Sequence, residues 1–255
     1  MPATLDTLSA DRQGASPYRL LVVNGNTTAT LTDSLALQAR AFFGAAVQLR
    51  SVTAPFGPPY IASRAEAAIS AHAVLAAVER EAALAEQPFE ACVLACFGEP
   101  GIGAVRERLN APVVGMAEAS IMTAMQRGDR YAIVTVGQRW PAMLREQIRQ
   151  LGVDSRCAGI LALPGNALDY ASRSSESAAA VSGALDQAAE LGADVVIVAG
   201  AALAGYLPSL PRPPRVPVID SYRAALAQAL ALASLERAHH FAYSRSRSPS
   251  DSPGQ

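Results

Sequence analysis

The 255-residue sequence contains no lysine, so all 21 of its basic side chains are arginines. A pyridoxal-phosphate enzyme forms its Schiff base on a lysine, and a Walker-type phosphate loop reaches its phosphates with one. This chain can therefore hold neither kind of site. Its chemistry must use thiols, carboxylates, hydroxyls, backbone amides or a bound group.

Net charge, cysteine and long apolar runs are also scarce. A formal net charge of -1 gives no sign of the basic face of a nucleic-acid binder. The three cysteines form an odd, widely spaced set rather than a disulfide framework. No apolar run reaches the roughly 18 residues of a membrane span, and the first residues lack the apolar core of a signal peptide. We therefore expect a soluble cytoplasmic protein that binds neither membranes nor nucleic acid.

Short apolar runs alternate with longer helical patterns along most of the chain. Hydrophobic residues make up 51% of the sequence but aromatics only 5%, which suits helices packed on a buried parallel sheet. The predicted strands cover 18–23, 47–52, 91–97, 131–136 and 194–199, with shorter ones near Val113 and Val218. The predicted helices cover 30–43, 63–85, 102–109, 140–151, 174–191 and 221–238. This alternation predicts an α/β fold with parallel sheets.

The two halves of the chain share a pattern of turns and strands. Tyr18 and Tyr131 lie 113 positions apart and Cys96 and Gly200 lie 104 apart, so the spacings nearly agree. We therefore predict two pseudo-symmetric lobes, each a short parallel sheet flanked by helices, with the active site in the cleft between them. The predicted divisions are a disordered N-terminus at 1–17, a first lobe at 18–120, a second lobe at 121–215, a strand and helix at 216–243 that return to the first lobe, and a disordered Ser/Pro/Arg tail at 244–255.

Cys96 is the main candidate for chemistry. It closes the apolar strand ACVLAC and precedes the turn Phe-Gly-Glu-Pro-Gly. The backbone amides of Phe97 and Gly98, together with the start of the next helix, are expected to lower the pKa of the Cys96 thiol. The alternative is that Cys96 is a small buried hydrophobe, which is the interpretation we favour for Cys92 and Cys157.

Two turns are candidate binding elements. Asn24-Gly-Asn26-Thr-Thr follows the first strand, where short polar side chains and helix amides can hold an anion or a carboxylate. An ordinary helix N-cap would explain the same residues. The corresponding turn of the second half, which contains Thr135 and Gly137, has both interpretations too. The sequence has no cluster with the spacing of metal ligands, so no metal site is predicted.

The segment FEACVLACFGEPGIGAVRERLNAPVVGMAEAS resembles the first catalytic segment of the aspartate/glutamate/hydantoin racemase superfamily, and in particular its hydantoin and allantoin racemase branch. LLVVNGNTT, GPPYI and VPVIDSYRAAL are further matches, and together they cover roughly residues 18 to 230. The resemblance implies two α/β lobes, no cofactor, and proton transfer at a carbon beside a carbonyl. It also implies a small-molecule substrate and the capacity of the chain to form a homo-oligomer.

The resemblance assigns roles to individual residues. Cys96 would be the first acid or base, and the amides of Phe97 and Gly98 would hydrogen-bond the developing enolate oxygen. The remaining substrate-binding residues would be Asn24, Asn26, Thr135, Gly137, Gly200 and Ala201.

The sequence departs from two-cysteine relatives at the second thiol. Gly200, or Ala201 with a shift of one place, stands where those relatives carry it, and neither side chain can carry a proton. Three interpretations remain open. The far face could use Tyr206, Glu99 or a water in a racemase or epimerase; Cys96 alone could serve a decarboxylase or lyase resembling arylmalonate decarboxylase; or the chain could be a non-catalytic small-molecule-binding relative.

Overall fold

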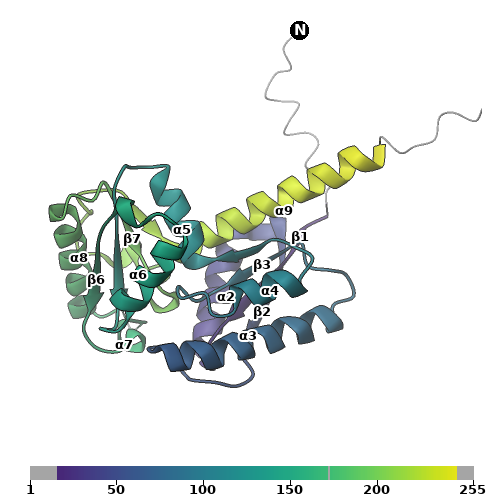
Figure 1. Cartoon of the computed structure of the whole chain (residues 1–255), viewed down its shortest axis with the longest axis horizontal. Helices are drawn as coiled ribbons and strands as arrows, with labels where there is room; N and C mark the ends of the chain where they lie inside the picture. Colours follow the sequence, from purple (N-terminus) through teal and green to yellow (C-terminus); the bar gives the residue numbers. More distant parts are fainter. Residues whose placement is uncertain (1–15, 172, 246–255) are drawn as a thin grey trace, which may run out of the picture.

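The computed structural model describes residues 16–171 and 173–245 and contains two four-stranded parallel sheets flanked by helices (Figure 1). The first sheet has the strand order β2-β1-β3-β4 and the second β6-β5-β7-β8. The strands are β1 (Tyr18–Asn24), β2 (Val47–Thr53), β3 (Ala91–Leu94), β4 (Val113–Gly115), β5 (Tyr131–Val136), β6 (Cys157–Leu163), β7 (Val195–Val198) and β8 (Val218–Asp220). The predicted α/β class with two similar parallel sheets is confirmed.

Helices connect and cover these strands. The α-helices are α2 (Ala29–Phe43), α3 (Arg64–Leu84), α4 (Ile102–Arg108), α5 (Met116–Met125), α6 (Trp140–Gln150), α7 (Ala167–Ala171), α8 (Ser175–Glu190) and α9 (Ser221–Arg245). Short 3-10 turns are η1 (Gly44–Ala46), η2 (Asp154–Arg156), η3 (Ala201–Leu203) and η4 (Leu207–Ser209). Ser63 is the N-cap of α3, because its hydroxyl accepts from the Glu66 amide; the Glu66 carboxylate in turn accepts from the amide of Ala62, the residue before the cap.

Several predicted boundaries were wrong. The edge strand β6 was not predicted; its sequence CAGILAL contains only apolar residues and glycine, so it lacks the alternation of apolar and polar residues that is typical of a half-buried strand. Strand β3 ends at Leu94 rather than at residue 97, and α9 continues past residue 238 to Arg245. The disorder predicted for the two ends concerns mainly residues 1–15 and 246–255, which lie outside the described residues.

Each sheet is covered on one side by a helix that leaves the other sheet. Helix α5 follows β4 but contacts β5, β7 and β8, whereas α9 follows β8 but contacts β1, β3 and β4 (Figure 1). The predicted division between residues 120 and 121 therefore falls inside α5. One continuous apolar cluster includes Leu20 of the first sheet and Ile133 and Ile197 of the second. The two sheets thus share one core, in addition to the apolar cluster that each sheet has of its own.

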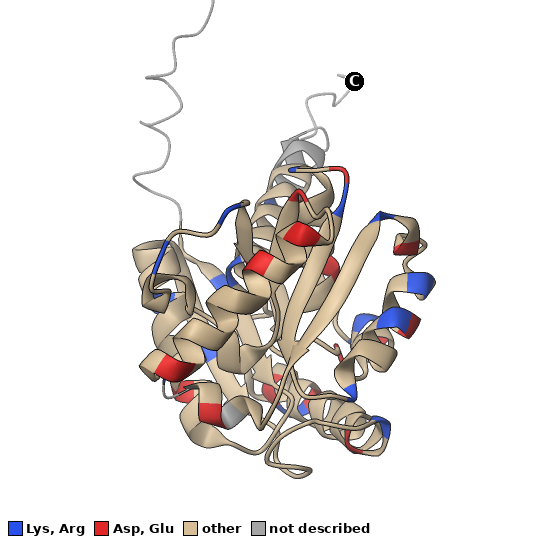
Figure 2. Ribbon diagram, turned by 90° about the vertical axis from the view of Figure 1, so that its left-hand side faces the viewer, with Lys and Arg blue, Asp and Glu red and all other residues tan. Residues whose placement is uncertain are grey.

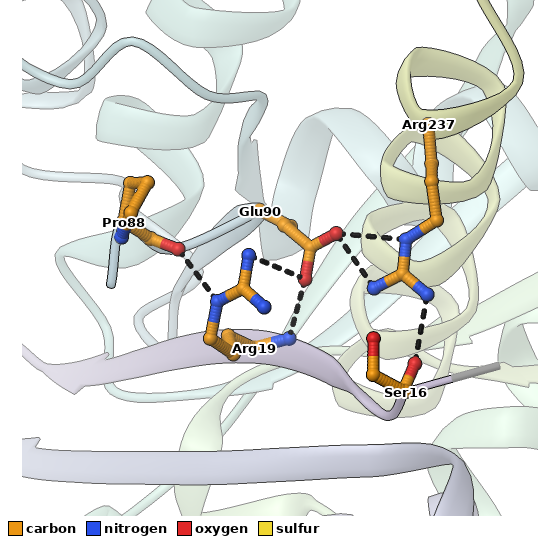
Figure 3. A network of polar contacts seen from close by, with 5 residues as sticks. All are labelled: Ser16, Arg19, Pro88, Glu90 and Arg237. Atoms are coloured by element: carbon orange, nitrogen blue, oxygen red, sulfur yellow. Dashed lines mark hydrogen bonds and ion pairs between the residues drawn. The ribbon is translucent and has the colours of Figure 1, made fainter. Parts of the chain in front are cut away.

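Helix α9 is fastened to the first sheet at the ends of the strands remote from the cleft. Figure 3 shows Glu90 between two arginines: Arg19 donates its backbone amide at 3.0 Å, and Arg237 donates Nε and a terminal nitrogen at 2.9 and 2.6 Å. Arg237 also donates to the Ser16 carbonyl and lies 3.7 Å from the centre of the Tyr18 ring. These contacts join α9 to the start of β1 and to the residue before β3.

The surface carries charges of both signs. Acidic and basic residues lie close together on the outer helices and loops in the view of Figure 2. Within the described part of the chain, no helix combines the length and the apolar character needed to cross a membrane.

Candidate active site

The carboxyl ends of the two sheets face a small cavity. It has a volume of about 40 Å³, which is small beside the roughly 300–1,000 Å³ of a typical ligand pocket. The lining residues are Asn26, Leu31, Tyr60, Ile61, Ala95, Cys96, Phe97, Thr135, Val136, Trp140, Ala167, Ala199, Gly200, Ala201, Ala202 and Leu203.

Cys96 enters this cavity from the turn after β3. The thiol is half-buried by surface exposure, yet the atoms around it exclude enough water to raise its pKa to about 11. The backbone amides of Gly98 and Glu99 hydrogen-bond the sulfur and oppose this rise, while the nearby Glu99 carboxylate adds to it. The predicted lowering of the thiol pKa was therefore wrong, because burial outweighs the amides. The sulfur is protonated at neutral pH.

The second sheet has a position equivalent to Cys96. In the first sheet the Ala95 amide donates to the Val23 carbonyl, and the Cys96 carbonyl then accepts from the third amide further on, at 3.0 Å. In the second sheet the Ala199 amide donates to the carbonyl of Val134, and the Gly200 carbonyl accepts from the third amide further on, also at 3.0 Å. Cys96 and Gly200 each lie two residues beyond the last residue of their strand. The internal symmetry therefore places Gly200 opposite Cys96.

Gly200 leaves an open space on its side of the cavity. Its φ of +112° is a backbone conformation that favours glycine, and a Cβ atom built there would meet nothing within 4 Å. Its amide donates to the Ser221 hydroxyl at 3.3 Å, which holds the turn against the start of α9. No side chain from this position reaches the cavity.

The predicted binding residues separate into two groups. Asn26, Phe97, Thr135, Gly200 and Ala201 line the cavity with Cys96. The other three, Asn24, Gly98 and Gly137, lie beside the cavity without lining it.

Asn24 belongs to the second group. Its side-chain amide donates to Asn26, Thr32 and the Thr28 carbonyl, so it shapes the turn. The carbonyl oxygen of the Asn26 side chain also accepts from the Thr28 amide, so Asn26 helps to hold the same turn.

The two glycines of the second group make room for an aromatic side chain. A Cβ atom on Gly98 would lie 2.6 Å from the Trp140 ring, and one on Gly137 would lie 3.2 Å from it. Gly137 also has a φ of +102°. The absence of side chains here lets Trp140, from the second half of the chain, pack against the Cys96 turn.

Tyr60 and Trp140 are lining residues that the sequence did not single out as site residues. Tyr60 lies in the loop GPPYI, between β2 and α3, yet its hydroxyl donates to the Val136 carbonyl at the end of β5, at 3.3 Å. The Trp140 side chain hydrogen-bonds the same hydroxyl. The membership of Tyr60 in a segment that matches the racemases was the one signal available for it.

The lining is largely apolar and carries no formal charge among the residues described. Its polar side chains are Asn26, Tyr60, Cys96, Thr135 and the Trp140 indole. An ionised carboxylate without a charged partner would be costly to bury in such a space. The cavity is therefore suited to an uncharged polar molecule.

Comparison with known proteins agrees with this architecture. The family model described as Asp/Glu/Hydantoin racemase matches residues 20–229. A hydantoin racemase of Paenarthrobacter aurescens is 34% identical over 222 residues, which are 85% of this chain and 92% of that protein.

Solved structures give the same result. An allantoin racemase from Klebsiella pneumoniae superimposes with a TM-score of 0.80 at 29% identity, covering 86% of this chain and 89% of its own. Unliganded arylmalonate decarboxylase, at 14% identity and a TM-score of 0.57 over 85% of this chain and 92% of its own, shares the fold. The chain belongs to the Asp/Glu/hydantoin racemase family and is an isomerase of the racemase type.

Proposed function

We propose that this protein interconverts the enantiomers of a cyclic ureide, such as a 5-substituted hydantoin or allantoin, by cofactor-independent proton transfer at the carbon next to the carbonyl. The observation that carries the proposal is the position of Cys96 in a cavity between two sheets whose lining has no charged side chain. A hydantoin ring is neutral and polar, whereas a free amino acid would bring charges that this lining does not neutralise. The hydantoin and allantoin racemases among its relatives support the same class of substrate.

Cys96 would exchange the proton on one face of the substrate. As a thiolate it removes the proton from carbon, and as a thiol it returns one. Because burial raises the pKa of this thiol to about 11, the thiolate fraction grows about tenfold for each pH unit below that value. Turnover should therefore rise from pH 7 towards pH 10, as long as the protein stays folded.

Isotope exchange tests this role directly. Each enantiomer of 5-isobutylhydantoin and of allantoin is incubated with the protein in deuterated buffer, and loss of the α-proton signal is followed by NMR alongside optical rotation. A sample without protein corrects for spontaneous exchange. The Cys96→Ser variant should neither exchange the α-proton nor racemise the substrate, because a hydroxyl is a far weaker acid than a thiol and gives almost no anion to act as base. Near-normal turnover in a folded Cys96→Ser protein would contradict the proposal.

A second candidate is one-sided decarboxylation, which the apolar walls favour because removal of water destabilises a carboxylate. In that reaction Cys96 would protonate one face after loss of carbon dioxide. Release of carbon dioxide from phenylmalonate, measured with the same protein, distinguishes it. The uncharged lining favours the racemase over this alternative, since an arylmalonate carries two carboxylates.

A further inference from the structure

A racemase needs a proton-carrying group on each face of its substrate. Cys96 supplies one, and the equivalent position of the second sheet, Gly200, has no side chain. Among the lining residues that the structure describes, Tyr60 is the other side chain with a dissociable proton suited to acid–base chemistry. Tyr60 is therefore the side chain in the lining that can serve as the second group.

Tyr60 belongs to the first half of the chain but reaches the second sheet. Its hydroxyl lies within hydrogen-bonding distance of the Val136 carbonyl, where β5 ends beside β7, the strand that leads to Gly200. It also lies 3.8 Å from the point that a Cβ atom on Gly137 would occupy. The phenol thus stands at the ends of the second-sheet strands, whereas the Cys96 thiol stands at the ends of the first-sheet strands.

We propose that Tyr60 is the acid–base group of the second face and takes the place of the thiol that Gly200 does not provide. This inference rests on the proposed racemase function. Burial raises the pKa of the Tyr60 hydroxyl, which keeps the phenol protonated and able to donate at neutral pH.

The other candidates for the second group lie outside the cavity lining. Tyr206 is fully buried in the second sheet's own apolar cluster, and its hydroxyl donates to Ser177 at 2.7 Å. The Glu99 carboxylate accepts from the Glu118 amide at 2.8 Å and from the Gln147 side chain at 2.6 Å. These hydrogen bonds hold it to the start of α5 and to α6. Neither residue lines the space between Cys96 and Gly200.

The proton transfers balance with these two groups alone. In one direction the Cys96 thiolate takes the α-proton, so a C–H bond breaks and an S–H bond forms. The Tyr60 hydroxyl then gives its proton to the opposite face of the enolate, so an O–H bond breaks and a C–H bond forms. The enzyme is left with a thiol and a phenolate, and this form converts the opposite enantiomer by the reverse steps.

The substitution Tyr60→Phe separates the two faces. With each enantiomer of 5-isobutylhydantoin in deuterated buffer, we expect the wild type to lose α-proton signal and optical rotation together. The variant should still exchange the α-proton of the enantiomer that presents it to Cys96, while loss of optical rotation slows by about 100-fold or more. Tyr206→Phe is the matched control, because it removes a phenol hydroxyl that does not line the cavity.

Each other outcome is decisive. A folded Tyr60→Phe protein that racemises within a few-fold of the wild type would overturn the inference. So would an equal loss of exchange and racemisation for both enantiomers, which would make the hydroxyl a hydrogen-bond donor to the enolate oxygen. A wild type that neither exchanges nor racemises hydantoins or allantoin would overturn the proposed function and this inference with it.

Discussion

Replacement of Glu99 by glutamine should remove a pH dependence of folding stability that this one carboxyl creates. Glu99 follows Cys96 in the turn after β3, is 6% exposed, and has a φ of +49°. Burial raises the pKa of its carboxyl from an ordinary value of 4.5 to about 7, although hydrogen bonds from the start of α5 and from Gln147 oppose the rise. The folded protein therefore favours the protonated carboxyl more strongly than the unfolded chain does.

The sign and the size of the effect follow from linkage. A carboxyl with a raised pKa stabilises the fold fully below pH 4.5, and this contribution is lost as the pH rises through about 7. At about 1.4 kcal/mol per pH unit, the free energy of unfolding should fall by about 2–3 kcal/mol between pH 5 and pH 8.5. Glutamine can still accept from the Glu118 amide without carrying charge, so Glu99→Gln should show little of this fall and be more stable than the wild type at pH 8.5.

Urea unfolding at pH 5, 6, 7 and 8.5 measures the difference. The groups at Cys92 and Cys96 titrate above this range, because burial raises their pKa values to about 12 and 11. Parallel stability curves for the wild type and Glu99→Gln would show that Glu99 is an ordinary ionised carboxylate and would refute the reasoning. Because the Glu99 charge also raises the pKa of the Cys96 thiol, alkylation of Cys96 should speed up in the variant.

Three further predictions concern the cysteines, the anchor of α9 and the second face. Cys92→Ala should lower the free energy of unfolding by about 1–2 kcal/mol because Cys92 is fully buried, and Cys157→Ala should lower it less. The racemisation rate of both variants should stay within a few-fold of the wild type; loss of activity with the fold intact would mean that the wrong thiol is assigned. Glu90→Gln should lower the free energy of unfolding by about 1–2 kcal/mol, less in 1 M salt, because both arginine partners are mostly buried; a salt-independent loss would count against the ionic contribution. Gly200→Cys should lower the free energy of unfolding by about 1–3 kcal/mol, because φ at this position is +112°, and yet it should restore racemisation to the Tyr60→Phe protein. If alkylation shows that the new thiol reaches the cavity but racemisation is not restored, the equivalence with Cys96 is contradicted.

The sequence predicted the strands best where both faces are buried. β5, with all six residues buried, was predicted residue for residue, and β1, whose last five residues are buried, to within one residue. The edge strand β2 was also predicted to within one residue, because its first residues alternate between apolar and polar. A short apolar run rich in valine and isoleucine and bounded by turn residues is typical of a strand that is buried on both faces. The edge strand β6 is apolar too but was missed, because it contains Gly159 and two alanines, residue types that are depleted in strands.

The exchange of helices between the sheets was only partly expected. The strand and helix at 216–243 were predicted to return to the first lobe; α9 contacts the first sheet, whereas β8 is an edge strand of the second. Apolar periodicity marks the face of a helix that is buried but does not state which sheet that face covers. Packing decides it: the Gln228 side chain of α9 donates to the Ala119 carbonyl of α5, and the Tyr222 hydroxyl donates to the Leu35 carbonyl of α2. These partners lie more than 100 residues apart in the chain.

The candidate site shows the same division between what a local pattern contains and what the folded chain assembles. The equivalence of Cys96 and Gly200 could be read from spacing, because each follows its strand by the same number of residues and parallel strands end at a common edge. Tyr60 could not, because its place depends on a loop of the first half reaching the strand ends of the second. A glycine at the symmetric position removes a side chain and admits another from a different element. The segment aligned with the second thiol therefore lacks an acid, whereas the cavity lining contains a phenol that we propose takes its place.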